Sequence, residues 1–223
     1  MSKLCVLVLA VALCGCRQQE TAPGSPAASE APKPAAKPVD TRPEIACFGD
    51  SLTAGLGLEP GQSFPALLQR ELDREGYRYR VANLGVSGDT TQDGLERLPL
   101  VLADKPVLVV LELGANDGLR GQPVAVTKDN LARIIEALQQ AGVRVLLAGI
   151  TLPPNYGPAY IGKFRAVYPE LAAKYRIPLI PFLLAGVGGD ARLMQRDGLH
   201  PNAEGTVVVA HTVLQSLKPL IKR

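Results

Sequence analysis

The 223-residue sequence contains no tryptophan, and aromatic residues make up only 4% of it. Its formal net charge is +3, and no dense block of lysine and arginine stands outside a proline-rich stretch near the N-terminus. Proteins that bind nucleic acids usually present a strongly basic surface, or aromatic rings on which bases stack. The sequence therefore does not favour nucleic acid as a partner.

Metal ligands of the nitrogen and sulfur kind are also scarce, because the chain has 2 histidines and 4 cysteines. Four aspartates follow predicted strands and could gather at one sheet edge: Asp50, Asp89, Asp117 and Asp197. Their spacing is not that of a compact metal site. It also does not favour a glycosidase, which uses a pair of carboxylates. We therefore expect no metal and no cofactor. We expect Asp50 and Asp89 to accept hydrogen bonds from loop amides instead.

The N-terminal region begins with an apolar run, residues 4–13, that is too short to cross a bilayer, for which a helix needs roughly 20 residues. Its length is that of a signal-peptide core. The motif that follows, Leu13-Cys14-Gly15-Cys16, resembles the lipobox of bacterial lipoproteins. The resemblance implies that residues 1–15 are a signal peptide and that Cys16 carries a lipid that anchors the protein to a membrane. An ordinary signal peptide or an uncleaved anchor is the alternative.

Residues 16–43 comprise this cysteine and a linker rich in proline and alanine, without apolar periodicity. Such a composition favours an extended chain that packs no core. The lipobox would place the domain that follows, residues 44–223, on the periplasmic side of the cell envelope, and Arg17 after the modified cysteine favours the outer membrane. The other cysteines lie in or beside the signal peptide, so Cys47 has no partner and we expect no disulfide.

From residue 44 onward, strand-like and helix-like segments alternate. Short apolar runs predict five strands, at residues 45–48, 79–84, 107–113, 143–150 and 178–182. Amphipathic periodicity predicts helices at residues 64–75, 91–103, 127–141 and 160–176, with a last helix ending near residue 217. We expect Thr127 and Asn202 to cap two of these helices, and Pro99 and Pro169 to interrupt or bend two others. The alternation predicts an α/β domain of three layers, in which helices cover both faces of a five-stranded parallel sheet.

Polar loops at the carboxyl ends of the predicted strands hold the candidates for chemistry. Ser51 follows the first strand in a turn that Gly49 and Gly55 permit, at the sheet edge where ligands bind in such folds. A serine hydroxyl is a weak nucleophile that needs a base. His200 is the candidate base, and Asp197, three residues earlier, could orient its ring. The alternative is a surface histidine that follows a turn-forming aspartate.

Ester hydrolysis also needs hydrogen-bond donors for the oxyanion that forms in the transition state. The side-chain amide of Asn116 and the backbone N–H groups of Gly88 and Ser51 are the candidates. Glycine and asparagine are common in loops for conformational reasons alone. Spacing by itself therefore does not separate an oxyanion site from ordinary turns.

Four segments together resemble the blocks of the SGNH (GDSL) hydrolase superfamily. In chain order they are Gly49-Asp50-Ser51-Leu52, Ser87-Gly88-Asp89-Thr90, Gly114-Ala115-Asn116-Asp117, and an Asp-x-x-His block that ends at His200. The resemblance implies a flavodoxin-like (SGNH hydrolase) fold. It also implies roles for individual residues: Ser51 as nucleophile, Asp197 and His200 as its partners, and Ser51, Gly88 and Asn116 as the oxyanion hole.

Within this superfamily, residues 87–92, 116–121 and 152–157 resemble the periplasmic thioesterase I/protease I/lysophospholipase type, also known as arylesterase. This implies a hydrolase of small acyl thioesters, aryl esters or lysophospholipids, whose acyl groove is bordered by residues 118–123 and 155–157. The tether and the Leu56-Gly57-Leu58 segment depart from that type and leave specificity open. Two alternatives remain: an acetyl esterase or acyltransferase acting on cell-envelope carbohydrate, and a non-catalytic lipoprotein whose groove binds lipid.

Overall fold

The computed structural model describes residues 40–223. The expected signal peptide, Cys16 and the linker up to residue 39 lie outside the described residues. Within the described part of the chain, no helix is both long enough and apolar enough to cross a membrane.

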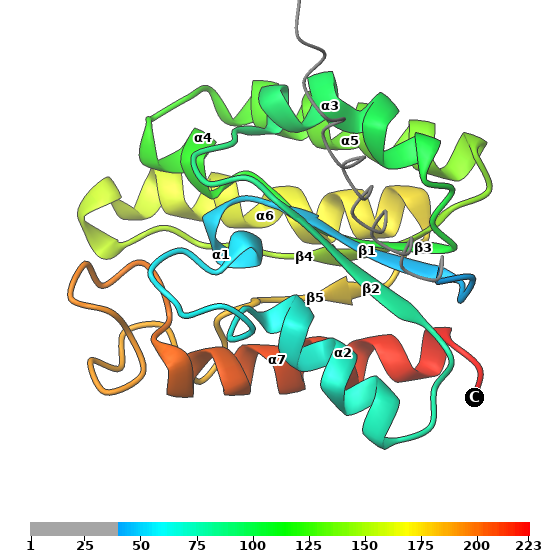
Figure 1. Ribbon diagram of the computed structural model, residues 1–223. Coiled ribbons are helices and arrows are strands. Elements are labelled where there is room, and N and C mark those ends of the chain that lie inside the picture. Colours follow the sequence, from blue (N-terminus) through cyan, green and yellow to red (C-terminus); the bar gives the residue numbers. More distant parts are fainter. Residues whose placement is uncertain (1–39) are drawn as a thin grey trace, which may run out of the picture. The chain divides into compact units, whose positions relative to one another are not determined.

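A single five-stranded parallel sheet forms the centre of the domain, in the order β2-β1-β3-β4-β5 (Figure 1). The predicted α/β class and parallel sheet are confirmed. The strands are β1 (Glu44–Gly49), β2 (Arg80–Gly85), β3 (Leu108–Glu112), β4 (Arg144–Ala148) and β5 (Leu179–Ile180). Both β1 and β3 are buried along their whole length, which is why their sequences are apolar runs rather than alternating patterns.

The strand β5 is shorter than the predicted 178–182. The carbonyls of Pro178 and Ile180 accept hydrogen bonds from Leu147 and Gly149 of the neighbouring segment. Pro181 has no N–H group, so it cannot donate to the ladder. The strand therefore ends at Ile180.

Helices cover both faces of the sheet, which gives three layers (Figure 1). The helices α2 and α7 lie on one face, and α3, α5 and α6 lie on the other. The bounds are α1 (Ser51–Ala54), α2 (Phe64–Arg74), α3 (Thr91–Ala103), α4 (Ala115–Leu119), α5 (Val124–Gln140), α6 (Pro158–Tyr175) and α7 (Ala203–Leu217), with 3₁₀ turns at Pro154–Tyr156 and Lys218–Leu220.

Two of the local helix predictions, for Thr127 and Pro99, are wrong; the prediction for Pro169 is wrong only in the break, and that for Asn202 is confirmed. Thr127 does not cap α5, which begins at Val124; its hydroxyl lies inside the helix, 3.3 Å from Asp117 Oδ1. Pro99 does not interrupt α3, and α6 runs through Pro169 without a break. Burial of one helix face against the sheet compensates for the hydrogen bond that each proline removes. Asn202 does cap α7, because its side chain accepts the N–H of Gly205 at 3.0 Å.

The order of the strands places a topological switch between β1 and β3, since the chain crosses to opposite sides after these two strands. Ligands in open α/β sheets bind outside the carboxyl ends of the strands at such a point. The short helices α1 and α4 begin there, and the segment between β5 and α7 reaches the same end of the sheet (Figure 1). The predicted serine, asparagine and histidine loops therefore share one edge.

Candidate active site

Ser51 stands at the first position of α1, two residues after β1 ends at Gly49. The side chain of Asp50 caps this short helix by accepting the N–H of Leu52 at 3.0 Å. Gly55 ends it in the left-handed conformation, with φ of 84°, which glycine adopts without strain. These two features fix a tight strand-to-helix turn with the serine at its apex.

The structure brings Ser51, His200 and Asp197 together in one hydrogen-bonded series. Ser51 Oγ lies 2.8 Å from His200 Nε2, although 149 residues separate the two in sequence. His200 Nδ1 lies 2.7 Å from Asp197 Oδ2. The other oxygen of Asp197 accepts the backbone N–H groups of Leu199 at 2.9 Å and of His200 at 3.1 Å. Both ring nitrogens of His200 are therefore engaged, and the ring has one orientation.

Asp197 is charged in this arrangement. Partial burial favours its neutral form, but the hydrogen bonds from His200 and from the two backbone N–H groups outweigh that effect and lower the pKa of the Asp197 carboxyl. The carboxylate can therefore stabilise a positive charge on the imidazole ring during proton transfer.

Gln195 joins the histidine loop to the serine turn. Its side-chain amide donates to the carbonyls of Leu56, at 2.7 Å, and Pro201, at 2.9 Å. Its backbone N–H donates to the carbonyl of His200 at 2.7 Å. The segment from β5 to α7 consists mostly of turns, with one isolated bridge between Met194 and Pro201. Gln195 therefore helps to hold the His200 loop against the Ser51 turn.

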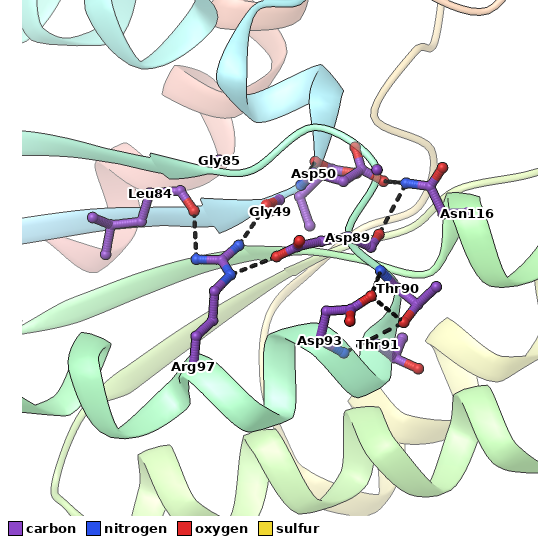
Figure 2. Close-up of polar contacts among 12 residues, drawn as sticks. Gly49, Asp50, Leu84, Gly85, Asp89, Thr90, Thr91, Asp93, Arg97 and Asn116 are labelled. Carbon is purple, nitrogen blue, oxygen red and sulfur yellow. Dashed lines mark hydrogen bonds and ion pairs between the residues drawn. The ribbon is translucent and has the colours of Figure 1, made fainter. Parts of the chain in front are cut away.

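The three candidate oxyanion donors line the same cavity as Ser51 Oγ and His200. Within residues 40–223, the N–H groups of Ser51 and Gly88 donate to no protein acceptor. Gly88 has φ of 92°, a conformation that other residues adopt only with strain. Asn116 Nδ2 lies 2.9 Å from the carbonyl of Asp89 and 3.2 Å from Asp50 Oδ2, so its amide is held from two sides (Figure 2).

Arg97 connects the ends of β1 and β2 below this site (Figure 2). Its guanidinium donates to the carbonyls of Leu84 and Gly49, each at 2.8 Å, and to Asp89 Oδ2 at 2.5 Å. It also lies 4.3 Å from the centre of the Phe48 ring. The prediction that Asp89 accepts hydrogen bonds from loop amides is wrong, because its carboxylate pairs with Arg97 instead. The corresponding prediction for Asp50 is confirmed by its bond from Leu52.

A cavity of about 570 Å³ opens beside the serine, with polar groups at one end and apolar walls. The apolar lining residues are Leu52, Leu56, Ala115, Leu119, Ile150, Leu152, Pro153, Pro154, Phe182, Leu184, Met194 and Leu199. Leu119, from the predicted loop 118–123, is among them, but residues 155–157 are not. The hydroxyl of Tyr156 donates to the Leu119 carbonyl at 2.8 Å, so this second loop supports the wall without forming it.

No group of three or more histidine, cysteine, aspartate or glutamate side chains in residues 40–223 is arranged to hold a metal ion. Cys47 in β1 is buried and forms no disulfide within the described residues, and burial raises the pKa of its thiol.

Sequence reasoning did not identify three residues that hold the site together: Arg97, Gln195 and Glu112, whose Oε2 accepts the Asp50 N–H and the Thr53 hydroxyl. Only Glu112 carried a clear signal, as the one charged residue in the otherwise apolar run 107–113. A charged residue inside a strand buried on both faces needs a specific partner. Arg97 and Gln195 look like ordinary surface residues, and only the tertiary fold reveals what they bind.

The chain is similar to known proteins over nearly all of this domain. The sequence pattern of the GDSL-like Lipase/Acylhydrolase family matches residues 47–207. Esterase TesA of Pseudomonas aeruginosa is 51% identical over 174 residues, which cover 78% of this chain and 87% of that protein. Thioesterase 1/protease 1/lysophospholipase L1 of Escherichia coli K12 is 40% identical over 175 residues, which cover 78% of this chain and 83% of that protein.

The fold is similar to solved structures as well. A crystal structure of TesA matches with a TM-score of 0.78 and 49% sequence identity, covering 80% of this chain and 99% of that one. Sequence and structure therefore lead to the same group of ester-cleaving proteins.

Proposed function

The chain belongs to the GDSL-like Lipase/Acylhydrolase family, and from this premise we propose that Ser51, His200 and Asp197 are the catalytic triad of a serine ester hydrolase. That the protein is a serine ester hydrolase follows from its relatives. The roles of the individual residues are the proposal. The observation that carries it is the series Ser51–His200–Asp197, at 2.8 and 2.7 Å, at the polar end of an apolar cavity.

Acylation begins when Ser51 Oγ attacks the carbonyl carbon of the ester. His200 Nε2, 2.8 Å from Oγ, accepts the hydroxyl proton, and Asp197 stabilises the resulting imidazolium through Nδ1–H. The tetrahedral oxyanion binds to the N–H groups of Ser51 and Gly88 and to the Asn116 amide. His200 then returns its proton to the leaving alcohol or thiol, and the acyl group stays on Ser51.

Deacylation repeats these steps with water as the nucleophile. His200 accepts a proton from water while the same three donors hold the second oxyanion. The carboxylic acid leaves, and Ser51 regains its proton from His200. No metal ion or cofactor enters this sequence of steps.

We propose that the preferred acyl group is an aliphatic chain longer than acetyl, in an oxygen ester, a thioester or a lysophospholipid. Twelve apolar residues line the cavity, and burying a methylene group contributes about 0.8 kcal/mol. The relative from Escherichia coli is named a thioesterase and a lysophospholipase, which supports this range of substrates. The alternative of an acetyl esterase or acyltransferase does not require so extensive an apolar lining.

A panel of p-nitrophenyl esters and the matching thioesters tests the acyl preference. We expect kcat/KM to rise roughly fourfold for each added methylene, or about 10²-fold from acetyl to hexanoyl, until the cavity is filled. Leu56→Asp, at the rim of the cavity, should lower the hexanoyl-to-acetyl ratio by about tenfold. Leu100→Asp is the matched control, because Leu100 is exposed and does not line the cavity.

A rate that is highest with acetyl esters and falls at hexanoyl would contradict this preference. It would favour the acetyl esterase acting on cell-envelope carbohydrate. Formation of an acyl-sugar in the presence of an oligosaccharide would identify the acyltransferase.

We further propose that the chain is a periplasmic lipoprotein, in which residues 1–15 are removed and residues 16–43 tether the domain 44–223. The motif Leu13-Cys14-Gly15-Cys16 supports lipid attachment at Cys16 and, with Arg17, an outer-membrane location. Metabolic labelling with a tritiated fatty acid should mark the protein but not its Cys16→Ser variant. Equal labelling of both would rule out this anchor.

A further inference from the structure

Two fully buried carboxyl groups lie beside the Ser51 turn, those of Asp50 and Glu112. The register of β1 and β3 pairs Gly49 with Glu112, so Glu112 stands at the carboxyl end of β3, next to the turn. Arg97 forms its ion pair with Asp89 and with neither of these groups. Two adjacent buried anions without a paired cation are costly, so one of the two is expected to hold a proton.

Glu112 holds the serine turn from both sides. Its Oε2 atom accepts the backbone N–H of Asp50 at 3.2 Å and the hydroxyl of Thr53 at 2.8 Å. These two donors precede and follow Ser51 in the chain. A Cβ atom at position 49 would lie 2.5 Å from the same oxygen, so a glycine is required there for this close approach.

The surroundings of the two carboxyls indicate which one is neutral. Both oxygens of Asp50 accept hydrogen bonds. One accepts the Leu52 N–H at 3.0 Å, and the other accepts Asn116 Nδ2 at 3.2 Å (Figure 2). Such donors suit an ionised carboxylate. Glu112 Oε1, by contrast, is buried and has no partner in the part of the chain that the structure describes. Glu112 Oε2 accepts the backbone N–H of Asp50, so the two residues are direct neighbours, and a proton on Glu112 could be shared with the Asp50 carboxylate.

We propose that Glu112 is a positioning residue: it keeps a proton that it shares with Asp50, so that the pair carries one negative charge and holds Ser51 and Asn116 in place for oxyanion binding. This inference rests on the proposed roles of Ser51 and Asn116. Asp50 is the link, because it both caps the helix of Ser51 and accepts a hydrogen bond from the Asn116 amide.

Electrostatics support the assignment of the proton. Burial, and then the charge of Asp50, raise the pKa of the Glu112 carboxyl well above its usual range. Burial raises the pKa of Asp50 to about 6, against the hydrogen bond from Leu52. Both shifts favour a proton on the pair, and the hydrogen bonds to both Asp50 oxygens favour that proton on Glu112. The other titratable or charged groups around the pair are Asp89, Arg97, Asp117, Tyr168 and His200.

The shared proton affects the oxyanion site through Asn116. Its Nδ2 has two hydrogens, and in the free protein its neighbours are two acceptors, Asp89 O and Asp50 Oδ2. Asp50 thus fixes the orientation of the amide, and an oxyanion in the cavity shares one of these hydrogens with it. A second negative charge on the pair would draw this hydrogen toward Asp50 and repel the oxyanion, so loss of the Glu112 proton as pH rises is expected to lower kcat.

Three variants test this proposal: Glu112→Gln, Glu112→Ala and Glu44→Gln. Glutamine has the shape and the donor of a protonated glutamate. We expect Glu112→Gln to keep kcat within about threefold of the unmodified protein near neutral pH and to lack its alkaline decline, while Glu112→Ala loses about tenfold or more. Glu44→Gln is the matched control, because Glu44, at the other end of β1, is also a buried strand glutamate whose Oε1 has no partner among residues 40–223. It should leave kcat and its pH profile unchanged.

Two further measurements do not depend on Ser51, so they remain decisive if the proposed triad is wrong or if Glu112→Ala does not fold. The infrared carbonyl band of an un-ionised carboxylic acid should disappear in Glu112→Gln. The folded protein binds more protons than the unfolded chain above the usual pKa of glutamate, so its unfolding free energy falls as pH rises. The stability of Glu112→Gln relative to the unmodified protein should therefore increase with pH. An unchanged infrared band, or a kcat for Glu112→Gln as low as that of Glu112→Ala in folded protein, would overturn the proposal.

Discussion

Replacing Ser51 with alanine is expected to lower kcat for ester hydrolysis by roughly 10⁴- to 10⁶-fold. The change removes the oxygen that forms the acyl-enzyme, and His200 is then left without the proton donor that lies 2.8 Å from its Nε2 atom. Any remaining activity would come from water held near the oxyanion donors. The loss in kcat is measured from initial rates with p-nitrophenyl hexanoate at saturating concentration.

A fluorophosphonate probe separates this explanation from a loss of structure. The unmodified protein should incorporate one probe molecule, attached to Ser51, and Ser51→Ala should incorporate none while keeping its melting temperature. Ser87→Ala is the matched control, because Ser87 is exposed in the loop next to Gly88 and should not alter labelling. Labelling of the Ser51→Ala protein at another serine would refute the assignment of the nucleophile.

Replacing Asn116 with alanine should lower kcat by roughly 10²- to 10³-fold while KM changes little. The amide lies at the polar end of the cavity and is held by Asp89 and Asp50 before substrate arrives. A donor that is oriented in advance stabilises the transition state more than the bound ester, so its loss appears in kcat. Steady-state kinetics of the variant on the hexanoyl ester measure both parameters.

Asn83→Ala provides the comparison for this variant. Asn83 also lies near the carboxyl end of a strand, inside β2, but its amide donates to the Ala54 carbonyl at 3.4 Å and to Ser63 Oγ at 3.3 Å. It should keep kcat within about threefold, since it does not line the cavity. An Asn116→Ala protein with equally small losses would show that the amide does not bind the oxyanion.

Much of the fold could be predicted because its signals are local. The apolar runs of β1 and β3 are as long as strands buried on two faces require, and Asn202 stands where α7 needs a cap. The predictions that failed also rested on local signals, but at these positions tertiary contacts determined the structure. Pro99 would end an isolated helix, but α3 continues because its buried face packs on the domain. Thr127 looks like a cap, but its hydroxyl is turned to Asp117 inside the protein.

The residues predicted for the site occur in short motifs, and parallel topology explains why their loops meet. What supports them could not be predicted in the same way. Arg97 binds two carbonyls from different strands, and Gln195 binds the carbonyl of Leu56, 139 residues earlier in the chain. Such bonds depend on distances between backbone groups that no sequence pattern encodes. Glu112 is the exception, since a charge in a buried strand demanded an explanation.

The base and the oxyanion donors belong to structurally different parts of the domain. Ser51, Gly88 and Asn116 follow the strands β1, β2 and β3, and the ends of the first two are tied together by Arg97. His200 and Asp197 belong to a segment of turns whose ties to the nucleophile turn include Gln195. Stabilisation of the oxyanion thus depends on residues that follow the strands of the sheet, whereas proton transfer depends on a separate loop. Evolution could therefore retune or replace the loop, altering how fast protons move, without rebuilding the platform that recognises the transition state.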